Sequence, residues 1–212
     1  HVLPHWNLAN VMEDTIPVMA YTNAEQVELF INGISQGIKT KGIDKADIPI
    51  DFKRWEELGQ KNYQSPYRLR WDVKYQPGEL KVVAYTKGKV VAEKVINTAS
   101  KPAQLELIPD RKIITADGED LSYITVNVLD KNGNFVPNAV NLINFEVTGQ
   151  GEIAAVGNGD SATLAPFQAN YRHAFSGKAM LIIRSKRGQA GNINIVAKSK
   201  GLESSSVVIQ SQ

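Results

Sequence analysis

The stretch from Val156 to Ser185 reads VGNGDSATLAPFQANYRHAFSGKAMLIIRS, and it decides how the rest of the chain is interpreted. Its Asn-Gly-Asp cluster at 158–160 contains the residue types that tolerate the positive φ of a tight turn. A polar excursion with one proline follows, and the run from Ala179 to Ser185 is strongly apolar. The stretch therefore predicts a turn, a variable loop and a core β-strand.

Apolar side chains alternate with polar ones through most of the remaining sequence, which is typical of half-buried β-strands. The sets expected on buried faces are Val27/Leu29/Ile31, Leu69/Trp71/Val73, Leu80/Val82/Ala84, Ile124/Val126/Val128, Ile143/Phe145/Val147, Leu181/Ile183 and Ile193/Ile195. Tight reversals are expected between them at Asn32-Gly33, Pro77-Gly78, Lys87-Gly88, Asn132-Gly133, Asn158-Gly159 and Arg187-Gly188. The fold class is all-β.

The segment NTASKP, residues 97–102, is small and polar and ends in proline, and it lies between two strand patterns. We expect a first β-sandwich over residues 1–98, a linker at 99–102 and a second β-sandwich over 103–212. Each side has the number and spacing of short strands of an immunoglobulin-like sandwich. The sequence predicts two such domains in tandem.

An insertion at about residues 41–65 interrupts the first domain and is longer than an ordinary connection. Within it, Asp51–Gln60 is the one segment that favours a helix, because Asp51 could cap it and Gly59 could end it.

Composition excludes several functions. The 24 basic and 22 acidic residues give a formal charge of +2 and are scattered, so nucleic acid is not an expected partner. There is no cysteine, which excludes disulfides and thiolate chemistry. No apolar run approaches the ~20 residues that a membrane-spanning helix needs. The chain begins at His1 without a signal-like segment, and we expect it to be part of something longer.

No catalytic, metal or cofactor site is predicted. Glycosidic hydrolysis uses two carboxylates, one of them with a raised pKa, but the acidic residues here occupy polar segments. These are Glu13-Asp14, Glu56-Glu57 and Asp117 with Glu119 and Asp120. Asp130-Lys-Asn-Gly-Asn134 resembles the start of a calcium loop, but Phe135 and Asn141 occupy the positions of the required glycine and glutamate. A hairpin turn explains the same residues.

The aromatic residues leave one binding hypothesis open. Trp55, Tyr63 and Tyr67 cluster in and just after the insertion, where their rings could stack on a sugar or could anchor the insertion to its own domain. Trp71 is assigned to the core, in register with its strand. His5 and Trp6, near the start, belong either to an edge strand or to a contact with an upstream domain.

Several segments carry a resemblance to a known family. LPHWNL (residues 3–8), IPVMAYTNAEQVELFINGISQG (16–37) and YQPGELKVVAYTKGK (75–89) resemble the small sandwich that follows the catalytic barrel in bacterial β-galactosidases of glycoside hydrolase family 2. LELIPDRKIITADGEDLSYITVNVLDKNGNFVPNA (105–139), INFEVTGQGEIAAVGNGD (143–160) and AFSGKAMLIIRS (174–185) are similar to the next module of those enzymes, which resembles the immunoglobulin-like repeats of invasin-type adhesins.

The resemblance implies a non-catalytic C-terminal fragment, because the catalytic glutamates of such enzymes lie on a barrel of about 250 residues. The implied partner is the missing catalytic domain, on which the fragment would pack or whose cleft it would shape. A homo-oligomer and a periplasmic or cell-surface location in a bacterium are also implied. Two alternatives remain: a carbohydrate-binding module that uses Trp55, Tyr63 and Tyr67, and an invasin-like cell-surface structural module.

Overall fold

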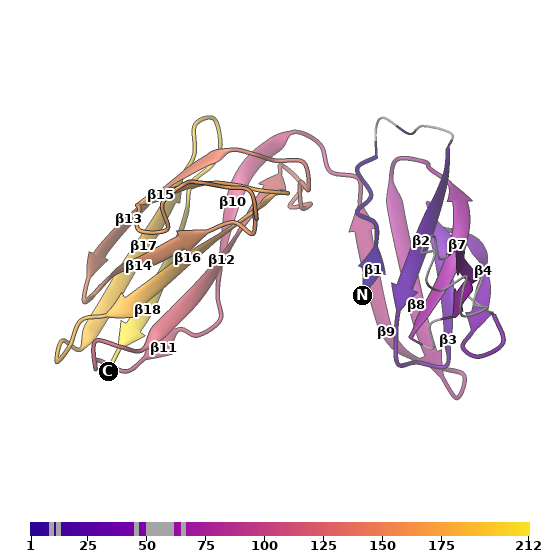
Figure 1. Cartoon of the computed structure of the whole chain (residues 1–212), viewed down its shortest axis with the longest axis horizontal. Coiled ribbons are helices and arrows are strands. Elements are labelled where there is room, and N and C mark those ends of the chain that lie inside the picture. Colours follow the sequence, from indigo (N-terminus) through magenta and orange to yellow (C-terminus); the bar gives the residue numbers. More distant parts are fainter. Residues whose placement is uncertain (9–10, 12–13, 45–46, 50–61, 65–66) are drawn as a thin grey trace, which may run out of the picture. The chain divides into compact units, whose positions relative to one another are not determined.

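The computed structural model describes residues 1–8, 11, 14–44, 47–49, 62–64 and 67–212. These residues form two compact units, His1–Thr98 and Ala99–Gln212 (Figure 1). Both units are built from β-strands, and no α-helix occurs in the described residues. The all-β prediction is confirmed.

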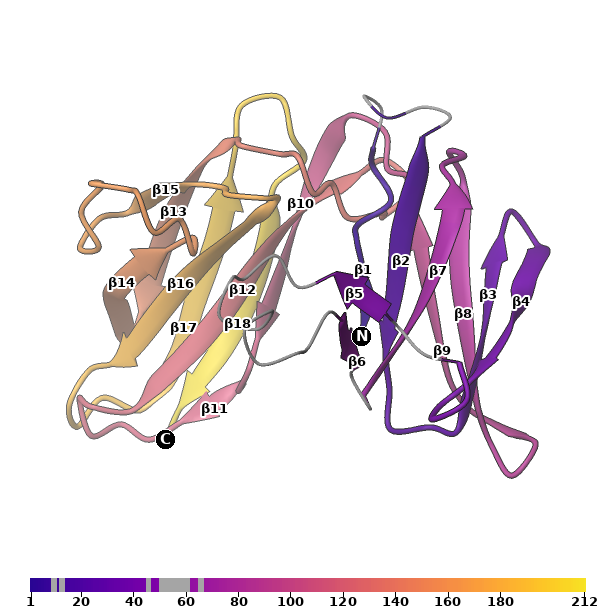
Figure 2. The ribbon, with the colours of Figure 1, turned by 45° about the vertical axis from the view of Figure 1, so that its right-hand side comes forward.

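The first unit is a β-sandwich of two antiparallel sheets. One sheet has the order β1-β2-β7, from Val2–Leu3, Thr15–Tyr21 and Arg68–Lys74. The other has the order β4-β3-β8-β9, from Ile34–Thr40, Gln26–Ile31, Glu79–Thr86 and Lys89–Asn97. A separate two-stranded antiparallel sheet, visible in Figure 2, consists of β5 (Asp47–Pro49) and β6 (Asn62–Gln64).

The first core contains the alternating side chains that the sequence predicts. Val27, Leu29 and Ile31 of β3 and the inward residues of β7 and β8 join one buried cluster with Val18 and Ala20 of β2. Because that cluster draws on both sheets, the sheets face each other across it. The outward residues of β3 are only partly buried, as a period of two requires.

Two hairpins of the first unit close in two residues. Asn32 and Gly33 have φ angles of 50° and 78°, and Lys87 and Gly88 have 51° and 71°. Positive φ at both central residues is the geometry of a type I′ turn, whose twist matches that of the flanking strands. Both predicted turns are confirmed.

The second unit is also a β-sandwich, with its two layers visible in Figures 1 and 2. One sheet has the order β10-β12-β16-β14, from Pro102–Pro109, Leu121–Asp130, Lys178–Ser185 and Gly151–Gly157. The other has the order β11-β18-β17-β13-β15, from Ile113–Ile114, Ser205–Ser211, Gly191–Lys198, Leu142–Gly149 and Tyr171–His173. Only β11 and β18 pair in parallel among the named strands.

The stretch from Val156 to Ser185 folds as predicted. Gly159 has a φ of 78°, and the side-chain amide of Asn158 donates to the backbone carbonyl of His173 at 3.0 Å. The Asn-Gly-Asp cluster is therefore a turn. The loop leads into the short strand β15, which the sequence did not predict, and β16 then buries Leu181 and Ile183 completely. The buried Arg172 donates to the carbonyls of Val156 and Pro166 and thereby ties the loop to β14.

The division between the units falls between Thr98 and Ala99. The Thr98 hydroxyl donates to the carbonyl of Trp6 at 2.7 Å, within the first unit. In the segment expected as a linker, Ala99 packs into the second core and β10 begins at Pro102. The helix predicted for Asp51–Gln60 lies outside the described residues, as does most of the insertion at 41–65.

Candidate functional site

The aromatic cluster predicted from the sequence is only partly described. Tyr67 precedes β7 and its side chain is 67% exposed. Tyr63 lies in β6, where its backbone pairs with Ile48, and Trp55 lies outside the described residues. Tyr67 is thus the one member of the cluster whose exposure the structure describes.

Trp6 is a core residue of the first unit. Its side chain is fully buried, its indole N–H donates to the carbonyl of Gln76 at 2.9 Å, and its ring meets that of Tyr75 edge to face at 4.9 Å. Its indole therefore offers no surface to another domain in this structure. A contact with an upstream domain at this point would rely on the exposed His5.

Trp71 also lies in the core, as predicted. Its side chain is 3% exposed, and its indole N–H donates to the carbonyl of Gly37 at 3.1 Å. The ammonium of Lys39 lies 5.6 Å from the ring centroid. Trp71 thus links β7 to β4 across the sandwich.

Asp130, which begins the calcium-like sequence, closes a hairpin turn with its carboxylate. The side chain is 1% exposed and accepts hydrogen bonds from the backbone N–H groups of Ser100, Asn132 and Asn134 at 2.8–2.9 Å. Desolvation by burial acts to raise the pKa of Asp130, but the hydrogen bonds outweigh it and hold the pKa well below its usual value. Within the described part of the chain, no group of three His, Cys, Asp or Glu residues could hold a metal ion.

In the acidic turn at 117–120, the pKa values of Asp117 and Asp120 are lowered, whereas a general acid needs a raised pKa. The backbone N–H groups of Asp120 and Glu119 lower the pKa of Asp117. The N–H of Thr115, helped by Arg111, lowers the pKa of Asp120. A carboxyl that donates a proton near neutral pH needs a raised pKa. The carboxylates of Asp117 and Asp120 therefore stabilise a turn. The other acidic residues considered from the sequence, Glu13 and Glu56-Glu57, lie outside the described residues.

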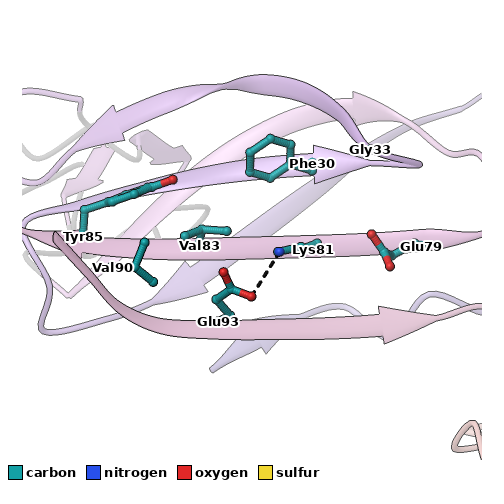
Figure 3. A pocket seen from close by; sticks show the side chains of 8 residues that line it. All are labelled: Phe30, Gly33, Glu79, Lys81, Val83, Tyr85, Val90 and Glu93. Atoms are coloured by element: carbon teal, nitrogen blue, oxygen red, sulfur yellow. Dashed lines mark ion pairs between the residues drawn. The ribbon is translucent and has the colours of Figure 1, made fainter. Parts of the chain in front are cut away.

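A groove of about 420 Å³ lies on the outer face of β3, β8 and β9 in the first unit (Figure 3). Strand pairing places its side chains in rows across the sheet. The three rows are Glu28–Val83–Glu93, Phe30–Lys81–Val95 and Gln26–Tyr85–Val90. The groove thus combines aromatic and aliphatic side chains with charged groups.

Hydrogen bonds and an ion pair fix the polar groups of the groove. The Tyr85 hydroxyl donates to Glu28 at 3.3 Å, and the Ser35 hydroxyl donates to the other oxygen of Glu28 at 2.6 Å. The Lys81 ammonium pairs with Glu93 at 3.0 Å. Desolvation, followed by the Glu28 carboxylate, raises the pKa of Tyr85, so its hydroxyl stays protonated at neutral pH.

Sequence reasoning missed this groove, because alternation assigns the outward residues of a strand to solvent. The run Lys81-Val-Val-Ala-Tyr85 contained a signal, since Val83 and Tyr85 put apolar surface on the outward face. Val83 is 4% exposed although it faces away from the first core.

The described residues thus define a pair of β-sandwich domains with a surface groove. Residues 105–208 match the model of the glycoside hydrolase family 2 C-terminal domain 5, and residues 13–92 match a domain of unknown function, DUF4982. The chain is 42% identical over 213 residues to the β-galactosidase BoGH2A of Bacteroides ovatus and 27% identical over 187 residues to a β-galactosidase of Thermoanaerobacter pseudethanolicus. These alignments cover 100% and 87% of this chain.

Solved structures agree with this match. A family 2 glycosyl hydrolase from Bacteroides cellulosilyticus superposes with a TM-score of 0.77 at 33% identity, over 99% of this chain and 24% of that one. A β-glycosidase from Bacteroides vulgatus gives 0.83 at 28% identity, with the same coverage of each chain. The chain belongs to the C-terminal β-sandwich region of the glycoside hydrolase family 2 proteins.

The chain spans 22% of the Bacteroides ovatus relative and 24% of the Thermoanaerobacter one. In the part of the chain that the structure describes, no helix has the length and apolar character that crossing a membrane requires.

Proposed function

We propose that the chain is the non-catalytic C-terminal pair of β-sandwiches of a β-galactosidase-type enzyme, and that it packs on a catalytic barrel of the same polypeptide and shapes one rim of its cleft. The observation that carries the proposal is the match of residues 105–208 to a C-terminal domain of family 2. The relatives' names, β-galactosidase among them, supply the substrate class.

The carboxylates of the described residues also support a non-catalytic role. Glu152 pairs with Arg184 at 2.6 Å and Glu146 with Lys198 at 2.6 Å, both at exposed positions. Ion pairs of this kind stabilise a surface weakly, and both of these carboxylates are already engaged by a basic side chain.

Hydrolysis by the isolated chain tests the proposal. The purified 212-residue chain should leave a chromogenic β-galactoside intact at every enzyme concentration. Turnover that survives further purification and scales with the chain's concentration would contradict a non-catalytic role.

The proposed partner can be tested through the encoding gene. It should also encode a barrel with two suitably placed glutamates, and removal of the region 1–212 from that longer protein should lower its kcat/KM or change its oligomeric state. A gene that encodes further sandwiches and no barrel would overturn the proposal. An extracytoplasmic location belongs to the same proposal and is tested by cell fractionation.

A carbohydrate-binding module is a second candidate, because the ring of Tyr67 is 67% exposed next to a segment that contains Trp55 and Tyr63. An exposed aromatic ring offers an apolar face on which a sugar can stack. Glycan binding that is lost in both Trp55→Ala and Tyr67→Ala would favour this function. Binding that persists in both variants would exclude that cluster.

A further inference from the structure

We propose that the groove on the outer face of β3, β8 and β9 is a binding site for a neutral oligosaccharide, with Phe30 and Tyr85 against the apolar face of a sugar and Lys81 and Glu93 bonded to its hydroxyls. The groove lies wholly within the first unit. The proposed site therefore does not depend on whether the chain accompanies a catalytic barrel.

The volume of the groove suits a small ligand. Its volume of about 420 Å³ lies within the range of roughly 300–1,000 Å³ that is typical of small-molecule sites. Figure 3 shows Phe30, Tyr85 and Val90 on the same face of the sheet, with the Lys81–Glu93 pair beside them. A ligand laid along β8 would meet all of these side chains.

Apolar side chains form part of the groove lining. Val83 forms part of the lining and is almost fully buried, whereas Val90 at its side is 55% exposed. One face of a pyranose ring carries C–H groups, and burial of this face against aromatic and aliphatic side chains is favourable. Phe30 and Tyr85 supply the aromatic surface.

Hydrogen-bond donors and acceptors lie beside these apolar side chains. Lys81 offers an ammonium, and Glu93 and Glu79 offer carboxylates. A sugar hydroxyl both donates and accepts, so a mixed set of this kind satisfies it better than a cluster of one sign would. Hydroxyl-rich ligands therefore fit the groove.

The charge of the groove further restricts the class of ligand that it can bind. The groove and its rows contain three glutamates, Glu28, Glu79 and Glu93, and one lysine, Lys81, and this set has a net negative charge at neutral pH. A uronic acid or a phosphate would be repelled, because like charges at close range disfavour binding. The groove should select neutral sugars over acidic ones.

The groove is organised before a ligand arrives. The hydrogen bond to Glu28 holds Tyr85, and Ser35 holds Glu28 in turn. Side chains that are already fixed lose less conformational entropy on binding. The ring of Tyr85 is therefore a ready surface rather than one that must be ordered by the sugar.

Titration of the intact chain tests the proposal. Neutral oligosaccharides of two to six hexoses, β-linked galactosides included, are added up to ~10 mM, and binding is followed by calorimetry and by amide NMR shifts. We expect shifts at residues 81–85 and 90–93, and a Kd that rises about tenfold in Tyr85→Ala. An oligosaccharide of the same length that contains uronic acids should bind more weakly.

One variant tests which part of the Tyr85 side chain contributes to affinity, and a second variant is a control. Tyr85→Phe keeps the aromatic face and should retain most of the affinity. Tyr123→Ala removes a tyrosine that is 43% exposed on β12 in the second unit, and it should change nothing. Unaltered amide spectra away from the substitution show that each variant is folded.

Three outcomes would overturn the proposal. They are the absence of shifts with every neutral oligosaccharide, shifts confined to the region of Tyr67, and equal affinity in Tyr85→Ala. Self-association of the chain through this face, seen as concentration-dependent shifts of the same amides without sugar, would assign the groove to a second copy instead.

Discussion

Asp130 shows how one carboxylate can replace a metal ion in ordering a turn. It accepts the backbone N–H groups of Asn132 and Asn134 in the turn, and it accepts both the backbone N–H and the hydroxyl of Ser100, the latter at 3.2 Å. A bound calcium ion would need those same oxygens. The side chain therefore supplies internally the order that an ion supplies in an EF-hand loop.

Asp130→Asn should destabilise the second unit by about 1–3 kcal/mol, because an amide N–H₂ would face backbone donors that the carboxylate now satisfies. Urea denaturation at pH 7, with a probe specific to the second unit, measures the loss. Glu152→Gln is the matched control in the same unit: it breaks an exposed ion pair with Arg184 and should cost less than about 1 kcal/mol.

The effect should depend on pH. The pKa of Asp130 is lower in the folded chain than in the unfolded one, so its stabilisation is fully present above about pH 4. It is lost as the pH falls below that value toward the folded pKa. The difference between wild type and Asp130→Asn should therefore shrink below pH 4, and a constant difference from pH 7 to pH 3 would contradict this account.

At the scale of the element, alternation in the sequence predicted the strands because one face of each is buried. Ile124, Val126 and Val128 are fully buried in β12, and Ile193 and Ile195 in β17. The groove could not be predicted in the same way. It depends on which strands become neighbours: the Lys87-Gly88 turn predicts that β9 pairs with β8, but a period of two in β8 does not reveal that β3 lies on its other side.

The turn before β16 depends on Gly177 for two separate reasons. Its φ is 76°, and a Cβ at this position would lie 2.2 Å from the carbonyl oxygen of Val136 and 2.8 Å from the ring of Phe135. Gly188 has a similar φ of 70° but open space around the same point. Substitutions at Gly188 and Gly177 can therefore distinguish the cost of backbone strain alone from the added cost of a steric clash.

Gly188→Ala should cost about 1 kcal/mol, from the left-handed conformation alone. Gly177→Ala should cost about 3 kcal/mol or more, because the backbone must also shift to admit the methyl group. Thermal or urea unfolding of both variants gives the comparison. Equal losses would show that the turn before β16 can relax around the added atom.

At the scale of the whole molecule, each unit has its own closed hydrophobic core. Trp6, Leu29 and Leu80 belong to one cluster, and Phe145, Leu181 and Ile195 to the other. A buried core of its own is the main requirement for a domain to fold alone. We therefore propose that residues 1–98 and 99–212 are independent folding units.

Thr98 determines where the chain can be divided. Its hydroxyl donates to the carbonyl of Trp6 and accepts the N–H of Gly78, and its own N–H donates to the carbonyl of Gly78 at 2.8 Å.

Fragments 1–98 and 99–212 should each give a cooperative unfolding transition. Fragment 1–97 should be less stable than 1–98 by about 1–3 kcal/mol, since groups around Trp6 and Gly78 lose their partner. Thr98→Ser in fragment 1–98 keeps the hydroxyl and should preserve most of the stability. Equal stability of fragments 1–97 and 1–98 in urea would place the end of the first folding unit before Thr98.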